Sequence, residues 1–445
     1  MKKQTPSRRK FLKTAGLTTL ITASGQVNSF ARGKSQSKIN SRYDFDKVFN
    51  RIGVNSIKWD GAIRKYGKDK IIVPMGIADM DFKQMPAVTK ALMERVEYES
   101  YGYEMVTDEY YQSIIDWNKN RYGQEIKKEW IRNSSGLTSG MVPALRGLNP
   151  VGGKVAVMTP TYSGFNIEIK KAGMRVEQSP MKKINGRWKM DLEDLESRLD
   201  YETKCLILCN PNNPTGECWT ADELRALGDV CIRHGVTVLS DEIWCDIIRK
   251  EQKYIPYASI GEKYADSSIT YKSAGKTFNQ AILKVAYFFT QNDDLMNAAM
   301  VGGGHQTEVN IFGQIATEVA YKKGAKWVDG LNQYLDSNFD YLVDYINTPG
   351  EMPGIEYSKP ESTYLAWLDC NGLKEKVATA DKLKEGQTPE DKLSEWLIEH
   401  AGVQLNAGHV YGIGSDGFLR MNIAVPRVHL KLALDNLNKA LKSII

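Results

Sequence analysis

Apolar residues follow two alternating patterns along most of the chain. Runs that are apolar, or apolar apart from a single threonine, occupy residues 155–158, 205–209, 236–239, 269–271 and 285–289. Segments with apolar residues at helical spacing accompany them, for example 86–97 and 220–234. The second segment begins with Thr-Ala-Asp-Glu, which has the form of a helix capping box. Fully apolar strands separated by helices indicate a mainly parallel sheet covered on both faces, and hence an α/β fold.

The pattern changes after Pro353. Residues 307–347 are predicted as long helices, and beyond them strands near 364–369 and 417–423 mix with helices near 389–400 and 428–443. This mixture predicts a second, smaller α+β domain. The highly charged residues 371–390 are interpreted as a solvated insertion. The predicted divisions are a signal segment at 1–31, an N-terminal segment at 32–87 that packs with the small domain, a large domain at 88–325 and a small domain at 326–445.

The positive charge of the chain is concentrated at its N-terminus. Residues 1–31 contain six Lys and Arg and no acidic residue, so the remainder carries a net charge of −1 against +5 for the whole chain. This near-neutral remainder argues against a nucleic-acid-binding protein. Residues 7–13 read Ser-Arg-Arg-Lys-Phe-Leu-Lys and precede a mildly apolar stretch, a pattern similar to a bacterial twin-arginine signal. We expect export to the periplasm; the alternative is a basic tail without a targeting role.

Membrane insertion and metal binding are not expected. No segment approaches the roughly 20 consecutive apolar residues of a membrane-spanning helix. The six cysteines and five histidines have no spacing typical of a zinc site or a disulfide framework. We therefore interpret the cysteines as small buried apolar residues.

Residues with catalytic potential follow three of the predicted strands. Residues 210–216 read Asn-Pro-Asn-Asn-Pro-Thr-Gly and follow one strand, Asp241 follows the next, and Lys276 lies just beyond a third. Taken singly, they would be a turn, a cap and a solvated lysine. Ligands of open α/β sheets bind at the carboxyl ends of the strands, so the three together favour a shared site.

Eight motifs occur in order along the chain. They are Ala-Asp-Met-Asp-Phe (78–82), Tyr-Gly-Tyr (101–103), Gly-Met-Val-Pro-Ala-Leu (140–145), Pro-Thr-Tyr (160–162), Asn-Asn-Pro-Thr-Gly (212–216), Ser-Asp-Glu-Ile (240–243), Gly-Lys-Thr-Phe-Asn (275–279) and Phe-Leu-Arg-Met-Asn-Ile-Ala-Val-Pro-Arg (418–427). Over about residues 42–443 the chain resembles the fold-type I pyridoxal 5′-phosphate (PLP) enzymes. More narrowly, it is similar to the MalY/PatB group of cystathionine β-lyases (C–S lyases), close relatives of the class I and II aminotransferases. The large domain would then bind PLP.

The resemblance implies a role for each residue around the cofactor ring. Lys276 would carry PLP as a Schiff base and then, as a free amine, remove the α-proton of the substrate. Asp241 would pair with the pyridine nitrogen, and Asn213 would donate a hydrogen bond to the ring hydroxyl. Tyr162 would stack on the ring face.

The resemblance also implies sites for the phosphate group and for the substrate. The phosphate would be bound by Ser139, Gly140 and Met141 at the start of a helix, with Ser273 as a further candidate. Arg420 would bind the substrate carboxylate, near the motif that contains Ala78 and Asp79. Tyr103 resembles a tyrosine that such enzymes contribute to the active site of a partner subunit, which predicts a homodimer with shared sites.

Two positions depart from the pattern of the group. Trp244 stands where relatives usually have Tyr or His, and an indole donates one hydrogen bond but does not titrate. Gly275 stands where the lyases usually have Ser, so one phosphate contact is missing. Lys284 could compensate for it electrostatically.

Three reactions would use these same residues. The leading hypothesis is β-elimination from cystathionine or cysteine-like amino acids, giving a thiol, pyruvate and ammonia. The alternatives are transamination of an amino acid and racemisation. A non-catalytic regulator with this fold is disfavoured, because Lys276, Asp241 and Arg420 are all present.

Overall fold

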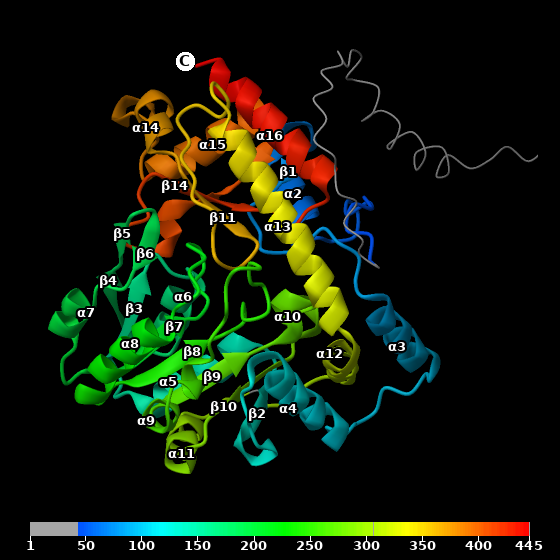
Figure 1. Ribbon diagram of the computed structural model, residues 1–445, viewed down its shortest axis with the longest axis vertical. Helices are drawn as coiled ribbons and strands as arrows, with labels where there is room; N and C mark the ends of the chain where they lie inside the picture. Colours follow the sequence, from blue (N-terminus) through cyan, green and yellow to red (C-terminus); the bar gives the residue numbers. More distant parts are fainter. Residues whose placement is uncertain (1–42, 306, 445) are drawn as a thin grey trace, which may run out of the picture. The chain divides into compact units, whose positions relative to one another are not determined.

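The main feature of the computed structural model, which describes residues 43–305 and 307–444, is a seven-stranded sheet of order β2-β10-β9-β8-β7-β3-β4 (Figure 1). Its strands are β2 (Ile131–Ser134), β3 (Lys154–Thr159), β4 (Arg175–Pro180), β7 (Thr203–Cys209), β8 (Thr237–Asp241), β9 (Ser268–Lys272) and β10 (Ala286–Phe289). Neighbouring strands are parallel except where β10 pairs with β9 and β2. The predicted α/β fold with a mainly parallel sheet is confirmed.

The register of the central strands aligns their carboxyl ends. Cys209 lies opposite Asp241, and Asp241 lies opposite Tyr271. The segments that leave β7, β8 and β9 therefore start side by side at one edge of the sheet.

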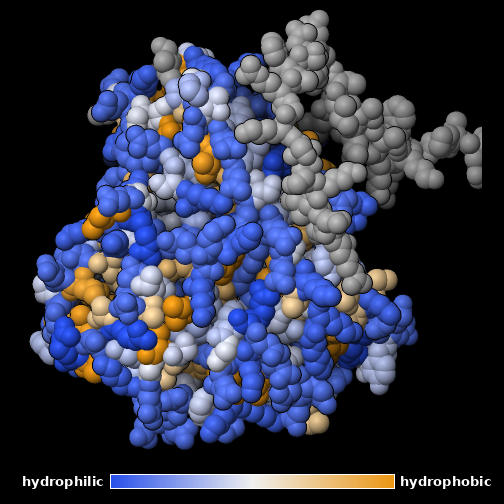
Figure 2. Space-filling view, in the orientation of Figure 1, coloured by the Kyte–Doolittle hydropathy of each residue, from blue (hydrophilic) through white to orange (hydrophobic). Residues whose placement is uncertain are grey.

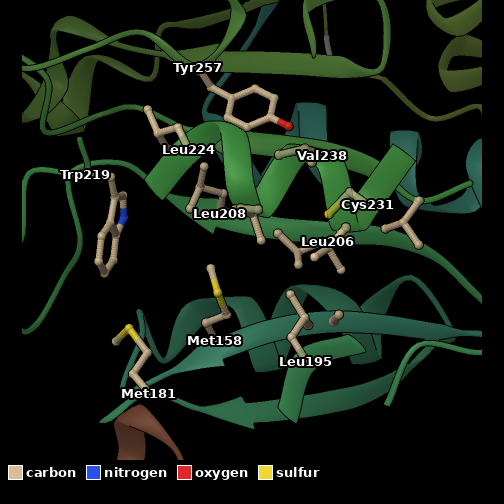
Figure 3. Close-up of a cluster of buried hydrophobic side chains, with 14 of the residues drawn as sticks. Met158, Met181, Leu195, Leu206, Leu208, Trp219, Leu224, Cys231, Val238 and Tyr257 are labelled. Atoms are coloured by element: carbon tan, nitrogen blue, oxygen red, sulfur yellow. The ribbon is translucent and has the colours of Figure 1, made fainter. Parts of the chain in front are cut away.

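One face of the sheet is covered by α7 (Leu192–Arg198) and α8 (Ala221–Arg233), as Figure 3 shows. Leu206 and Leu208 of β7 pack in this core with Leu224 and Cys231 of α8. The capping box predicted at residue 220 begins α8. Because side chains alternate along a strand, the residues between them on β7 point to the opposite face, where they too are buried. The sheet is thus buried on both sides.

The helix α5 (Leu137–Leu148) contacts β2, β7, β9 and β10. The remaining helices of this part of the chain are α3 (Pro86–Glu97), α4 (Asp108–Tyr122), α6 (Gly164–Lys171), α9 (Glu262–Asp266), α10 (Ala274–Thr277), α11 (Asp293–Val301) and α12 (Ile311–Lys323). A two-stranded hairpin, β5 (Lys182–Ile184) and β6 (Arg187–Lys189), follows β4.

A second group of elements surrounds a small antiparallel sheet of order β11-β14-β13. Its strands are β11 (Leu365–Asp369), β13 (Asn406–Ala407) and β14 (Phe418–Asn422). The short strand β1 (Val73–Pro74) pairs with β12 (Val403–Gln404), so the N-terminal segment contacts this part of the chain. The helices here are α2 (Ala62–Tyr66), α13 (Ala325–Asn347), α14 (Asn371–Val377), α15 (Pro389–Ala401) and α16 (Arg427–Lys442). The predicted insertion at 371–390 contains α14, which buries Leu373 and Val377, so it is not fully solvated.

All six cysteines are buried and unpaired. This confirms their interpretation as small buried residues. Over residues 43–305 and 307–444, no helix combines the length and apolar character needed to cross a membrane. Figure 2 shows a largely hydrophilic face, on which apolar residues form small separate groups.

Candidate active site

A cavity of about 1070 Å³ lies at the carboxyl ends of the central strands. Ten of the residues singled out in the sequence line it: Ala78, Ser139, Tyr162, Asn213, Asp241, Trp244, Ser273, Lys276, Lys284 and Arg420. They come from loops after β3, β7, β8 and β9, from α5 and from β14. Residues far apart in the chain thus meet in one site, as the positions after the strands predicted.

Lys276 extends from the short helix α10, directly after β9. Its Nζ donates a hydrogen bond to the Ala78 carbonyl at 2.8 Å. Burial and, to a smaller extent, the positive charge of Arg420 lower the pKa of Lys276 to about 8, against the opposing effects of Asp79 and Asp241. About a tenth of the amine is then uncharged at pH 7, far more than for an ordinary lysine, and able to act as a nucleophile or base.

Asp241 is the last residue of β8 and is 5% exposed. One of its oxygens accepts a hydrogen bond from the Ile243 N–H at 3.1 Å. Burial raises the pKa of Asp241 to about 7, the negative charges of Glu168 and Glu242 add to the effect, and Lys276 opposes it. A carboxyl group in this setting is stabilised in its charged form by a cationic or N–H group in the cavity.

Arg420 reaches the cavity from β14 of the small sheet. Its Nη1 donates to Asn213 Oδ1 at 3.0 Å, and its Nη2 donates to the Gly76 carbonyl at 2.9 Å. The Nε is buried and has no hydrogen-bond partner within the described part of the chain. The guanidinium is held in place by two of its five N–H donors, and the remaining donors suit it to an incoming carboxylate.

A second corner of the cavity is suited to an anion. The residues from Ser135 to Ser139 line it, and they include the first turn of α5, where backbone N–H groups lack helical partners. The Ser273 hydroxyl accepts from the Gly275 N–H at 2.9 Å and donates to the Val285 carbonyl at 2.7 Å. An added Cβ on Gly275 would lie 3.1 Å from the Ser273 Oγ, so a larger residue at this departure from the pattern would require the Ser273 side chain to shift.

Trp244 forms part of the cavity wall. Its ring lies 4.8 Å from that of Tyr364, centroid to centroid and edge to face, and 5.6 Å from Lys276 Nζ. The Tyr364 hydroxyl donates to the Ala78 carbonyl at 3.2 Å, the same acceptor that Lys276 uses. Trp244 therefore supplies a rigid apolar surface beside the amine.

Four of the predicted site residues do not line the cavity. Gly140 and Met141 are buried within α5, past its first turn. Asp79 forms an ion pair with Arg51 at 2.6 Å and acts on Lys276 only through its charge. Tyr103 is fully exposed on the surface of the chain.

Two further features were not anticipated from the sequence. Glu168 of α6 lines the cavity and accepts a hydrogen bond from the Thr138 hydroxyl. Glu242 and Lys272, next to Asp241 and Ser273 in the chain, form a buried ion pair of 3.5 Å. Glu242 belongs to the Ser-Asp-Glu-Ile motif, but neither that motif nor the spacing of Glu168 and Lys272 showed that these charges are buried. Over residues 43–305 and 307–444, no group of three or more His, Cys, Asp or Glu is arranged to hold a metal ion.

The chain is similar to a known family and to several known proteins over most of its length. The chain matches the family described as Aminotransferase class I and II over residues 70–437. It is 33% identical to cystathionine beta-lyase PatB of Bacillus subtilis over 405 residues, which are 89% of this chain and 100% of PatB. It is 31% identical to protein MalY of Escherichia coli over 90% of this chain and 100% of MalY.

A solved structure gives the same result. The PLP-bound C–S lyase of Staphylococcus hominis superimposes with a TM-score of 0.82 at 32% identity. The match covers 91% of this chain and 99% of that protein.

Proposed function

Because the chain belongs to the class I and II aminotransferase family, we propose that it is a PLP-dependent C–S β-lyase of the PatB/MalY group, which converts cystathionine or a related cysteine conjugate to a thiol, pyruvate and ammonia. The observation that carries the proposal is the end-to-end similarity to a cystathionine β-lyase, together with a cavity in which Lys276, Asp241 and Arg420 converge.

The residues of the cavity fit PLP. Lys276 offers an amine of lowered pKa for the covalent bond, and Asp241 offers a buried carboxyl group without an ion-pair partner among the described residues. The backbone N–H groups in the first turn of α5 offer donors for the phosphate, whereas the Ser273 hydroxyl already donates its proton to the Val285 carbonyl. When bound, PLP supplies an electron-withdrawing ring that stabilises negative charge at the α-carbon of the substrate.

The protein's own groups account for binding and proton transfer. Arg420 binds the substrate carboxylate, with its unpaired Nε as an additional donor. Lys276 Nζ, once free, accepts the α-proton. Asp241 holds a proton at the nitrogen with which it pairs. The electron pair left at the α-carbon forms the double bond to the β-carbon as the bond from the β-carbon to sulfur breaks, and the sulfur leaves with the electrons of that bond and is protonated to the thiol. Water then hydrolyses the released aminoacrylate to pyruvate and ammonia.

The alternative is an aminotransferase, because transamination would use the same lysine, carboxylate and arginine. Trp244 stands at a position where the lyases usually have Tyr or His, and this difference from the lyases is the reason to test the aminotransferase alternative. Racemisation shares the α-proton step. A purely non-catalytic role is disfavoured by the intact set of ionisable groups in the cavity.

The decisive experiment mixes the purified, PLP-loaded protein with L-cystathionine and follows pyruvate and the absorbance of the bound cofactor together. Multiple turnovers of pyruvate with an unchanged cofactor spectrum are expected of the lyase. A single turnover that yields a keto acid and converts the cofactor to its amine form would replace the proposal by an aminotransferase. Lys276→Ala is the control for catalysis by free PLP.

We further propose that the protein is exported by the twin-arginine pathway to the periplasm. The proposal rests on residues 1–31, which lie outside the described residues. A twin-arginine system moves folded proteins, so PLP could be loaded before export. Replacing Arg8 and Arg9 by Lys is expected to leave the protein in the cytoplasmic fraction.

A homodimer with shared sites is also proposed. Tyr103 is fully exposed although its ring is largely apolar, and Met105 beside it is 85% exposed. Such a surface is consistent with burial against a second copy of the chain. Sedimentation of the full chain would test the oligomeric state, and Tyr103→Ala is expected to weaken PLP binding.

A further inference from the structure

Glu168 is an acidic residue on the buried face of a helix. It lies on α6 with Phe165 and Ile169, and the three are 6%, 1% and 0% exposed. Ile167 on the same helix is 56% exposed, so α6 has an outward face that could carry an acid at no cost. Glutamate is rarely buried without a partner or a role. The position of Glu168 therefore requires an explanation beyond the folding of α6.

The carboxyl group of Glu168 is fixed at the edge of the cavity. It lines the cavity and accepts a hydrogen bond from the Thr138 hydroxyl in the first turn of α5. Burial raises the pKa of Glu168 to about 7, an effect that Thr138 and Lys171 only partly oppose. Among the described residues it has no ion-pair partner within 4 Å, and its charge is not neutralised by contact.

Glu168 and Asp241 line the same cavity. The negative charge of Glu168 raises the pKa of Asp241, to which burial contributes most. The charge of Glu168 also reaches Tyr271 of β9 and Tyr162 before α6, and both phenols are neutral near pH 7. The cationic groups that line the same cavity are Arg146, Lys171, Lys276, Lys284 and Arg420, of which Lys171 acts on Glu168 and Lys276 on Asp241. Within the described residues none of them lies within 4 Å of either carboxyl group as an ion-pair partner.

We propose that Glu168 is a positioning residue of the cofactor site, which acts through Asp241 to favour a proton on the ring nitrogen of bound PLP. Two carboxyl groups that face one low-dielectric space both become charged only if a positive charge is placed with them. A protonated ring nitrogen beside Asp241 supplies that charge, and Glu168 adds to the negative potential that holds it. The inference rests on the PLP assignment within the proposed function but not on the reaction.

The consequence of a second acid is a more persistent ring proton. A protonated nitrogen makes the ring a stronger electron acceptor, so Glu168 would extend the pH range over which the ring withdraws electrons. Glu168→Gln isolates this role, because glutamine has nearly the same shape and its amide oxygen can still accept from Thr138. Only the charge is removed.

The experiment measures the ring nitrogen directly. The full chain is freed of cofactor, reconstituted with PLP carrying ¹⁵N in the ring, and titrated with pH while the ¹⁵N chemical shift is recorded, without substrate. In Glu168→Gln the midpoint of ring deprotonation is expected to fall by about one unit, which is a tenfold lower proton affinity. Glu193→Gln, an equal charge change at an exposed residue of α7, is expected to keep the wild-type midpoint.

An unchanged midpoint in a folded, PLP-saturated Glu168→Gln protein would overturn the proposal. Should that variant fail to fold, Thr138→Val tests the same point, because loss of the hydroxyl leaves the Glu168 carboxylate without its donor and favours its neutral form. The ring midpoint should then fall in the same direction, and a wild-type midpoint would again refute the inference. Absence of pyruvate from L-cystathionine would refute the lyase alone, since the ¹⁵N titration uses no substrate.

Discussion

The buried ion pair between Lys272 and Glu242 allows a quantitative prediction. Lys272 is 2% exposed and Glu242 is fully buried, and their charged atoms are 3.5 Å apart. Lys272 Nζ also donates to Asn118 Oδ1 at 2.8 Å and lies 4.4 Å from the Tyr122 ring centroid. The Tyr254 hydroxyl donates to Glu242. Lys272 Nζ also donates to Gln124 Oε1 at 3.3 Å, and Glu242 also accepts from the Ser240 hydroxyl and the Tyr257 N–H, so each charge has several neutral partners and, among the described residues, one opposite charge within 4 Å.

Removing one member should destabilise the protein strongly. At 3.5 Å and an effective dielectric constant of about 20, the attraction is about 5 kcal/mol. Breaking a buried pair by truncating one partner costs about 3–5 kcal/mol, because the other charge is left buried. We expect Lys272→Met and Glu242→Gln each to cost about 4 kcal/mol. With an unfolding entropy of about 2.1 cal/mol/K per residue, this lowers the melting midpoint of the chain by about 4–5 °C.

A double-mutant cycle tests the reasoning. Calorimetry of both single variants and of the double variant Lys272→Met/Glu242→Gln should show that the double loss is clearly smaller than the sum, since neither charge is then left alone. The control is Lys263→Met, which breaks the shorter 2.6 Å pair with Asp229, whose side chains are 60% and 43% exposed. Solvent screens that pair, so its midpoint should stay near wild type. Additive effects at the buried pair, or an equal effect at the exposed pair, would refute the argument.

Three other predictions concern the cavity. Lys276→Ala should remove the visible absorbance of protein-bound PLP after desalting. An absorbance band like that of the wild type would show that Lys276 does not bind PLP covalently. The rate at which PLP bonds to the cofactor-free protein should rise with pH and level off above about pH 8. The reason is that the pKa of Lys276 is lowered to about 8 and only the unprotonated amine reacts. Stopped-flow absorbance at a series of pH values measures this rate, and a rate independent of pH would contradict the prediction. Arg420→Ala should weaken binding of the substrate amino acid by about 30-fold or more, since a buried charged contact contributes about 2 kcal/mol or more. Spectral titration measures the affinity. An unchanged affinity would show that Arg420 does not bind the substrate carboxylate.

The periodicity of apolar residues predicted the core of the large sheet. The runs at 155–158, 205–209, 236–239, 269–271 and 285–289 all coincide with strands to within one residue, because a strand buried on both faces has few polar positions. The strands β2 and β4 were not predicted. Both lie at the edges of the sheet, where one side of the strand meets solvent or loops, and polar residues such as Arg175 and Glu177 of β4 interrupt the apolar pattern.

The site residues that belong to the ordered motifs were predicted from the sequence. Lys276, Asp241, Asn213, Tyr162 and Arg420 all face one cavity. Glu168 was missed, because a glutamate followed by two lysines on a short amphipathic helix is typical of a solvent-facing turn, and only the packing of α6 reveals which side is buried. The role of Tyr103 stays a prediction, since it concerns a second copy of the chain.

The six buried cysteines have a consequence for an enzyme whose product would be a thiol. Cys209 lines the cavity yet is 3% exposed, its Sγ donates to the Pro211 carbonyl at 3.3 Å, and burial holds its pKa well above the usual value. Burial likewise raises the pKa of the other five. Only thiolates exchange with disulfides at an appreciable rate. In the proposed lyase reaction, the thiol product and any disulfide formed from it would therefore meet no reactive thiolate with which to form a mixed disulfide.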